Sequence, residues 1–92
     1  MPAILMNNDD NVATAISDIP PDEEVLVSSP DGETRYKIKA KNRIPCAHKL
    51  AVKTIESGND VIKYGEVIGR AKQKIETGEH THIHNVESKR IK

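Results

Sequence analysis

The chain has 92 residues with equal numbers of acidic and basic side chains, so its formal net charge is zero, and 36% of its residues are hydrophobic. It contains two tyrosines and no phenylalanine or tryptophan, which argues against single-stranded nucleic-acid binding because that activity relies on aromatic stacking. The zero net charge also lacks the basic excess of DNA-binding domains. We expect one small domain, residues 1–92, with a thin core of Ile, Val, Leu and Ala that gains from a partner covering further apolar surface.

The charges are unevenly distributed along the chain. Residues 1–34 contain eight acidic side chains and no Lys or Arg, whereas the remainder contains all fourteen basic side chains and six acidic ones. This dipolar pattern suits docking to another protein surface. The single cysteine, Cys46, excludes an internal disulfide and fits a reducing compartment. Because the sequence shows no signal peptide and no long apolar run, we expect a cytoplasmic protein with no membrane partner.

Short strands separated by turn residues are expected in the first third of the chain. Residues 3–6 are apolar and predict a strand, the Asn and Asp residues at 7–11 predict a turn, and residues 12–16 favour a strand over a short helix. Pro20 and Pro21 end that element. Residues 24–28 predict another strand, followed by a hairpin turn at 29–33.

Residues 35–44 show the clearest alternation in the sequence. Basic side chains occupy every second position from Arg35 to Arg43, with mostly apolar residues between them. A helix would scatter these charges, whereas a strand sorts them into one basic and one largely apolar face. The basic face is either a solvated edge that discourages aggregation or a cationic wall facing an anionic substrate or an acidic partner.

The second half predicts further strands. Residues 48–55 place Leu50 and Val52 on one side and Lys49 and Lys53 on the other, and strands are expected at 60–64 and 66–69. Residues 71–76 can instead form a short helical turn. A weak repeat relates 55–61 to 75–81, with the same spacing at 19–25, and each copy reads as a turn feeding a strand. The sequence therefore predicts an all-β domain with short helical turns.

Three of the four histidines, His80, His82 and His84, stand at alternate positions near the end of the chain. In an extended strand they would share one face, with Thr81 and Ile83 on the other. Such a row can bind a divalent metal ion or supply proton-transfer groups. The alternative is an exposed strand with a polar face. No Asp, Cys or His elsewhere in the sequence obviously completes a metal site.

Three segments carry a family resemblance: residues 45–51 (PCAHKLA), 61–69 (VIKYGEVIG) and 78–85 (GEHTHIHN). In this order and spacing they resemble the small module of the hydro-lyase family that contains altronate dehydratase, galactarate dehydratase and sulfolactate sulfo-lyase. The opening DDNVA, residues 9–13, is similar as well. The resemblance implies a SAF-type β-clip fold and a larger catalytic body, either fused to this module or supplied as a separate subunit.

The resemblance also implies a chemistry and a set of residues. The reaction is elimination of water or sulfite from a 2-hydroxy acid such as altronate or sulfolactate, with iron(II) or manganese(II) as cofactor, held by this chain or mainly by the partner subunit. His48 is the expected acid/base or metal ligand and Lys49 the expected carboxylate contact. The remaining candidates are substrate contacts (Lys63, Tyr64 and Asn85) and metal ligands (His80, His82 and His84).

Several points stay open from the residues alone. His48 can instead only cap a turn after Pro45, and Lys49 can be an ordinary surface residue. Lys63 and Tyr64 can instead be structural, with the Tyr64 ring packed into the core. Ala47 stands where the family usually has Gly, which strains the loop before His48 if that position needs positive φ. The alternative function is a non-catalytic module of the same fold that recognises a carbohydrate or an assembly partner.

Overall fold

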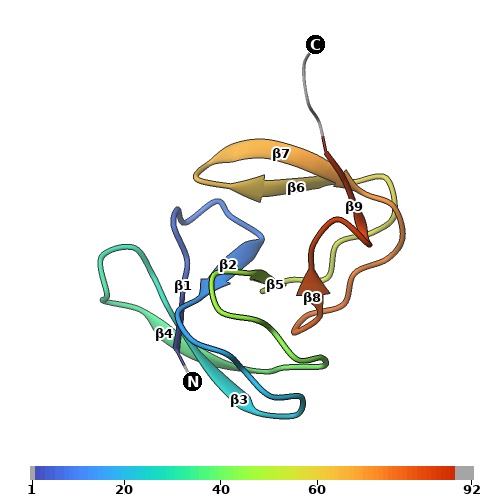
Figure 1. The fold of residues 1–92 in the computed structure, drawn as a ribbon. Helices are drawn as coiled ribbons and strands as arrows, with labels where there is room; N and C mark the ends of the chain where they lie inside the picture. The colour runs from blue at the N-terminus through green and yellow to red at the C-terminus, as the bar shows by residue number, and fades with distance from the viewer. Residues whose placement is uncertain (1, 89–92) are drawn as a thin grey trace.

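The computed structural model describes residues 2–88 as short β-strands joined by turns (Figure 1). The strands are β1 (Pro2–Ile4), β2 (Val12–Ala15), β3 (Glu24–Ser28), β4 (Arg35–Lys39), β5 (Lys49–Ala51), β6 (Asp60–Lys63), β7 (Glu66–Ala71), β8 (His80–Thr81) and β9 (Val86–Ser88). Between residues 2 and 88 there is no helix, and hence none long and apolar enough to cross a membrane. The expected domain bounds, 1–92, include residues 1 and 89–92, which lie outside the described residues.

The all-β prediction is confirmed, but the short helical turn expected at 71–76 is wrong. Ala71 ends β7, and Ile75 instead pairs with Ile55 in an isolated β-bridge whose two N–H···O bonds are both 2.8 Å long. This pairing occupies backbone groups that a helical turn would need.

The strands form two sheets (Figure 1). The larger has the order β4-β3-β1-β2-β5-β8, and all its pairs are antiparallel except β1 with β3. The smaller has the order β6-β7-β9 and is antiparallel throughout. In the view of Figure 1, the β6–β7 hairpin crosses the top of the molecule, while β3 and β4 lie at the opposite end. Strand β9 was not expected from the sequence.

The core consists of two clusters that share β2 and β5 as a common wall. Side chains alternate along a strand, so Val12 enters one cluster and Ala13 the other, and Leu50 and Ala51 divide in the same way. The second cluster joins the two sheets, because it packs Val12 and Ala51 against residues of β6 and β7. All the buried hydrophobic side chains are Ile, Val, Leu or Ala, as the composition predicts.

One turn geometry occurs four times. In each copy an Ile in a β-bridge precedes, by three residues, a residue with positive φ, and a strand starts two residues later. The bridges join Ile19 to Ile44 and Ile55 to Ile75, and the positive-φ residues are Asp22, Ala47, Gly58 and Gly78. The sequence repeat predicted three of these turns. The fourth, at residues 44–49, was not part of that repeat, and its positive-φ position is held by Ala47, a residue that rarely marks such a turn.

The β6–β7 hairpin is fastened to the larger sheet by Asp10 and Asn11. Tyr64 and Gly65 both have positive φ, as a type I′ turn requires, and their backbone N–H groups donate to the fully buried Asp10 carboxylate at 2.9 and 2.8 Å. The Asn11 side chain accepts from the N–H of Ile62 and donates to the carbonyl of Asp60. The Tyr64 ring projects from this turn and is 63% exposed, so its expected packing into the core is wrong.

The basic strand is shorter than expected, since β4 ends at Lys39. The chain then bends toward Gly78, whose carbonyl accepts the N–H of Lys41, and a Cβ on Gly78 would collide with the carbonyl oxygen of Lys39. The alternation of burial nevertheless persists through Ala40. The basic side chains are exposed, and three of them form surface ion pairs: Lys37–Glu24, Lys41–Glu76 and Arg43–Asp18. This arrangement favours a solvated edge over a cationic wall.

Candidate functional site

The pairing of β5 with β8 brings His48 beside the C-terminal histidines. Leu50 is opposite His80 and Lys49 is opposite Thr81. His48, one residue before β5, therefore lies near His80 and His82. Its Nδ1 is 2.9 Å from Nε2 of His80, and its ring stacks on that of His82 with centroids 4.3 Å apart. The structure therefore brings the expected acid/base residue together with two of the three expected metal ligands.

The expected extended row of histidines is wrong in its geometry. Strand β8 contains only His80 and Thr81, after which the chain turns at residues 82–85. The buried Asn85 closes this turn: its Oδ1 accepts the N–H of His82 at 2.9 Å and its Nδ2 donates to the carbonyl of His80 at 2.8 Å. The turn reverses the chain so that β9 can pair with β7.

Despite the turn, the rings remain close. The centroids of His80 and His82 are 5.7 Å apart, and those of His80 and His84 are 5.2 Å apart. His84 itself is exposed, and the group of nitrogens close enough to share one ion consists of His48, His80 and His82. His48 thus takes the place that the sequence assigned to His84.

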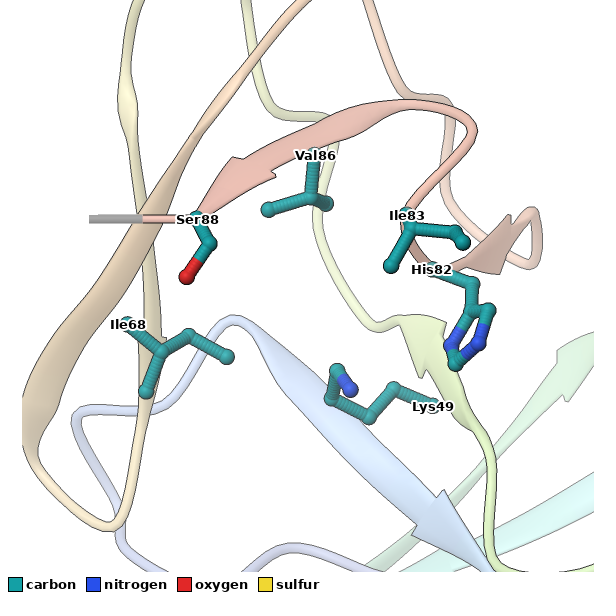
Figure 2. A pocket seen from close by; sticks show the side chains of 6 residues that line it. All are labelled: Lys49, Ile68, His82, Ile83, Val86 and Ser88. Atoms are coloured by element: carbon teal, nitrogen blue, oxygen red, sulfur yellow. The ribbon is translucent and has the colours of Figure 1, made fainter. Parts of the chain in front are cut away.

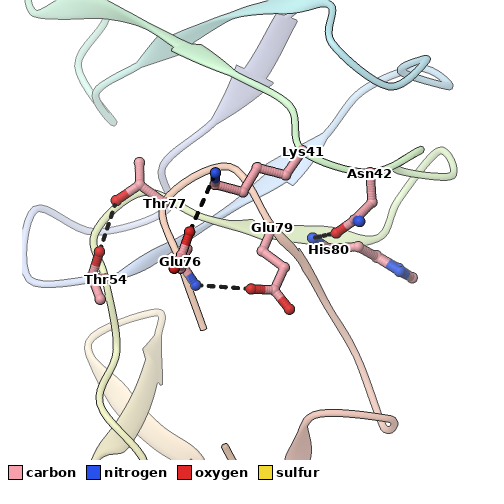
Figure 3. A network of polar contacts seen from close by, with 7 residues as sticks. All are labelled: Lys41, Asn42, Thr54, Glu76, Thr77, Glu79 and His80. Carbon is pink, nitrogen blue, oxygen red and sulfur yellow. Dashed lines mark hydrogen bonds and ion pairs between the residues drawn. The ribbon is translucent and has the colours of Figure 1, made fainter. Parts of the chain in front are cut away.

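The backbone at His80 is fixed by a side chain from a distant segment. The N–H of His80 donates to Oδ1 of Asn42 at 2.9 Å (Figure 3). The turn before His80 is held by Glu79, which accepts the N–H of Glu76, and Glu76 in turn pairs with Lys41 at 3.2 Å (Figure 3). The role of Asn42 was missed, because no local pattern shows that an exposed-face Asn reaches a strand 38 residues away.

His48 is held by the fourth of the repeated turns. Its N–H donates to the carbonyl of Pro45, and its carbonyl accepts from the N–H of Ala15, both at 2.9 Å. Ala47 has φ of 72°, so the position does require the conformation that favours glycine. The turn therefore exists with alanine, and its backbone carries the strain that the sequence predicts.

The cluster disfavours positive charge. The pKa of His80 is lowered from 6.5 to about 4, first by burial and then by the charges of the other three histidines and Lys49. The pKa of His82 is lowered by burial and then by His48, Lys49 and His84. His80 is therefore neutral at pH 7 and keeps a ring lone pair for a proton or a metal ion.

Lys49 lines a pocket of about 250 Å³ (Figure 2). The other lining residues are Ile68, His82, Ile83, Val86 and Ser88. The pKa of Lys49 is lowered by burial and then by the charge of Lys63, and among the ion pairs formed by the described residues none involves Lys49. An ammonium group without a carboxylate, in a partly apolar hollow, is suited to an anionic ligand.

The other candidate substrate contacts are placed differently. Lys63 is partly buried and its charge reaches Lys49, while its Nζ also sits 5.4 Å from the centroid of the Tyr64 ring. Tyr64 is at the exposed tip of the β6–β7 hairpin. Asn85 is fully buried and uses its amide to close the turn at His82, so we assign it to positioning the histidines rather than to contacting substrate.

The donor set of the cluster fits a metal ion. Ligand nitrogens of His48, His80 and His82 all lie within 4.8 Å of one another, and no Asp, Glu or Cys among residues 2–88 joins them in that group. Imidazole is a good ligand for iron and zinc, whereas manganese is better served by carboxylate and water oxygens. Of the two metals that the resemblance implies, these residues therefore fit iron(II) better.

Comparison with known proteins identifies the family of the chain. Residues 1–89 match the family described as the altronate/galactarate dehydratase SAF domain, which confirms the predicted SAF-type domain. The (2R)-sulfolactate sulfo-lyase subunit alpha of Chromohalobacter salexigens is 43% identical over 60 residues, covering 65% of this chain and 64% of that one. Its counterpart from Paracoccus pantotrophus is 44% identical over 55 residues, covering 60% and 82%.

A second kind of relative is much longer. Altronate dehydratase of Bacillus subtilis is 34% identical over 85 residues, covering 92% of this chain but 16% of that protein. The chain thus matches a small part of one relative and less than two thirds of the C. salexigens subunit.

Proposed function

Because the chain belongs to the SAF-domain family of altronate and galactarate dehydratases, we propose that it is a module of a carbon–oxygen or carbon–sulfur lyase. In this proposal it acts in the cytoplasm with a larger catalytic subunit and helps eliminate water or sulfite from a 2-hydroxy acid such as altronate or sulfolactate. The observation that carries the proposal is the position of Lys49, a partly buried cation without a carboxylate partner among the described residues, beside the histidine cluster.

Elimination from such an acid needs a base and an acid at adjacent carbons. The base takes the proton from the carbon next to the carboxylate, and the bond from the neighbouring carbon to oxygen or sulfur breaks with its electron pair. Protonation of the departing hydroxide gives water. When it holds no metal ion, His48 is our candidate for this proton transfer, because a free imidazole titrates near neutrality and the contact with His80 orients its ring. Its alternative role is that of a metal ligand.

The carboxylate of the substrate must be neutralised as the α-proton leaves. Lys49 can donate to it from the wall of the pocket (Figure 2), and Lys63 adds a second positive charge nearby. An anion bound there would relieve the repulsion between the two ammonium groups. Iron(II) or manganese(II), when bound, would stabilise negative charge on the reacting carboxylate, and His48, His80 and His82 are the residues of this chain that would hold it.

Tyr64 and Lys63 support the proposal in a second way. The exposed Tyr64 ring, with the Lys63 ammonium 5.4 Å from its centroid, is the kind of aromatic group that protein interfaces use. We propose that this hairpin tip contacts the larger subunit or the substrate that it holds.

The test is to express the chain together with a candidate large subunit and to assay elimination on sugar acids and on sulfolactate. We expect activity to require both chains and kcat/KM to fall at least tenfold in Lys49→Met, which is about 1.4 kcal/mol of transition-state stabilisation. Lys53→Met is the matched control, because Lys53 is exposed and lies two residues beyond β5. A large subunit that is fully active alone would favour the non-catalytic binding module instead.

A further inference from the structure

We propose that His48, His80 and His82 form a complete three-imidazole site that lets this chain alone bind a divalent transition metal, with a preference for metals that accept nitrogen ligands. The proposal departs from the histidine row of the sequence in two ways. It replaces His84 with His48, and it needs no ligand from a partner subunit. Its connection with lyase chemistry rests on the proposed function, whereas metal binding itself does not.

The distances are close to those that a shared ion imposes. Imidazole nitrogens bind zinc-like ions at about 2.0–2.1 Å, so two of them on one ion are roughly 2.9–3.4 Å apart at octahedral or tetrahedral angles. Nδ1 of His48 and Nε2 of His80 are 2.9 Å apart. One ring nitrogen of each of the three histidines lies within 4.8 Å of the other two, so no pair has to approach by more than roughly 2 Å, which rotation of the partly exposed rings can supply.

The backbone is already fixed where the ligands attach. Asn85 bonds to the backbone on both sides of Thr81, and Asn42 bonds to the N–H of His80. His48 is held by the turn at Ala47 and by its carbonyl bond to Ala15. A site whose ligands are oriented by their surroundings loses less conformational entropy on binding than one assembled from mobile loops.

The protonation state also favours a cation. At 2.9 Å the two facing nitrogens of His48 and His80 share one hydrogen. A neutral imidazole can move its hydrogen to the other ring nitrogen, so both facing lone pairs become available without adding charge to either ring.

Lys49 opposes the cation, and this gives the site a specific signature. Its charge acts on both His80 and His82, so it must weaken metal binding when the pocket holds no anion. Removing that charge should therefore tighten metal binding, although the same change should lower lyase activity. These opposite effects separate the electrostatic role of Lys49 from a general loss of structure.

The experiment is a calorimetric titration of the isolated chain with cobalt(II), followed in parallel by visible absorption, and with magnesium(II) as the oxygen-preferring comparison. We expect one cobalt(II) per chain and at least tenfold weaker binding of magnesium(II). His48→Ala and His82→Ala should each weaken cobalt(II) binding at least tenfold, and Lys49→Met should strengthen it severalfold. Cys46→Ser is the control for the exposed thiol, and it should leave the affinity unchanged.

Three results would overturn the inference: no cobalt(II) binding by the wild-type chain, equal affinity for magnesium(II), or full binding by His48→Ala. If His84→Ala abolishes binding while His48→Ala does not, the ligands are those of the sequence row and the inferred set is wrong. His48→Gln, which keeps most of the volume, replaces His48→Ala if the latter does not fold by circular dichroism. A chain that binds no metal within an active two-subunit enzyme refutes this inference and leaves the proposed function intact. Metal binding by the chain without lyase activity of the two-subunit enzyme supports this inference and counts against the proposed function.

Discussion

Asn85 accepts the backbone N–H of His82 at 2.9 Å from a fully buried position, and so fixes the direction in which that histidine leaves β8. The same amide donates to the carbonyl of His80, so one side chain orients two of the three proposed ligands. Removing it should therefore disturb the site although Asn85 coordinates nothing itself.

For Asn85→Ala we expect a loss of about 1–3 kcal/mol in the free energy of unfolding, because two partly buried backbone groups lose their partner. Cobalt(II) affinity should fall roughly 10- to 100-fold, as is usual when a group that orients metal ligands is removed. Urea unfolding and calorimetry measure the two effects. Asn59→Ala, in the exposed turn before β6, should change neither quantity, and an unchanged affinity in Asn85→Ala would contradict the positioning role.

Ala47→Gly should stabilise the chain. The φ of 72° at this position costs alanine about 1–2 kcal/mol. Glycine avoids that cost, but its greater freedom in the unfolded chain destabilises the variant by about 0.5–1 kcal/mol. We expect a net gain of about 0.5–1 kcal/mol in urea unfolding.

The converse substitution is Gly58→Ala, in an equivalent turn with φ of 87° and open space around the added Cβ. It should destabilise by a similar amount, since only the backbone conformation penalises it. If both substitutions change the free energy of unfolding in the same direction, turn conformation does not govern these effects.

Asp10→Ala should be strongly destabilising. The carboxylate is fully buried and accepts the N–H groups of Tyr64 and Gly65, so its removal leaves two donors of the hairpin turn without an acceptor. We expect a loss of about 3 kcal/mol, within the range for charge-assisted bonds to buried groups. The exposed neighbour Asp9→Ala is the control. Similar urea midpoints for both variants would mean that the hairpin does not depend on this carboxylate.

The metal-free chain should lose stability in mild acid. The unfolded chain protonates His80 near its ordinary pKa of 6.5, whereas burial and neighbouring charges lower the folded pKa to about 4. Between these values the unfolded state binds more protons, so the free energy of unfolding is greatest above pH 6.5 and falls as the pH is lowered toward 4.

This pH dependence can be measured by urea unfolding at pH 7 and pH 5, together with NMR titration of the imidazole protons. His80→Gln should show a shallower loss between the two pH values. A folded His80 that titrates near 6.5 would refute the expectation.

Local patterns predicted most of the strands. β3, β4 and β6 are short apolar or alternating runs bounded by Pro, Gly or Asn residues, and such signals need no knowledge of distant contacts. Strand β9 escaped detection because Val86 follows the histidines directly, and its pairing with β7 becomes possible only through the turn that Asn85 closes.

The structure brings His48, His80 and His82 of the predicted candidates together, in a geometry that the sequence did not predict. His48 and His80 are 32 positions apart, and nothing in either segment specifies that β5 pairs with β8. Likewise, Asn85 reads as a polar residue available to substrate until the structure shows it buried within the turn. Long-range pairing and burial are the two properties that a single sequence encodes least directly.

The 32-residue separation of His48 and His80 also bears on how the chain folds. Bringing such distant residues together has an entropic cost, because it closes a long loop. Their imidazoles meet only after β8 has paired with β5. A cation that bridges them in the native state alone would add about 2.7 kcal/mol to the free energy of unfolding at a hundred times its dissociation constant. The bound metal would then serve as a removable cross-link, a role that a chain with one cysteine cannot give to a disulfide.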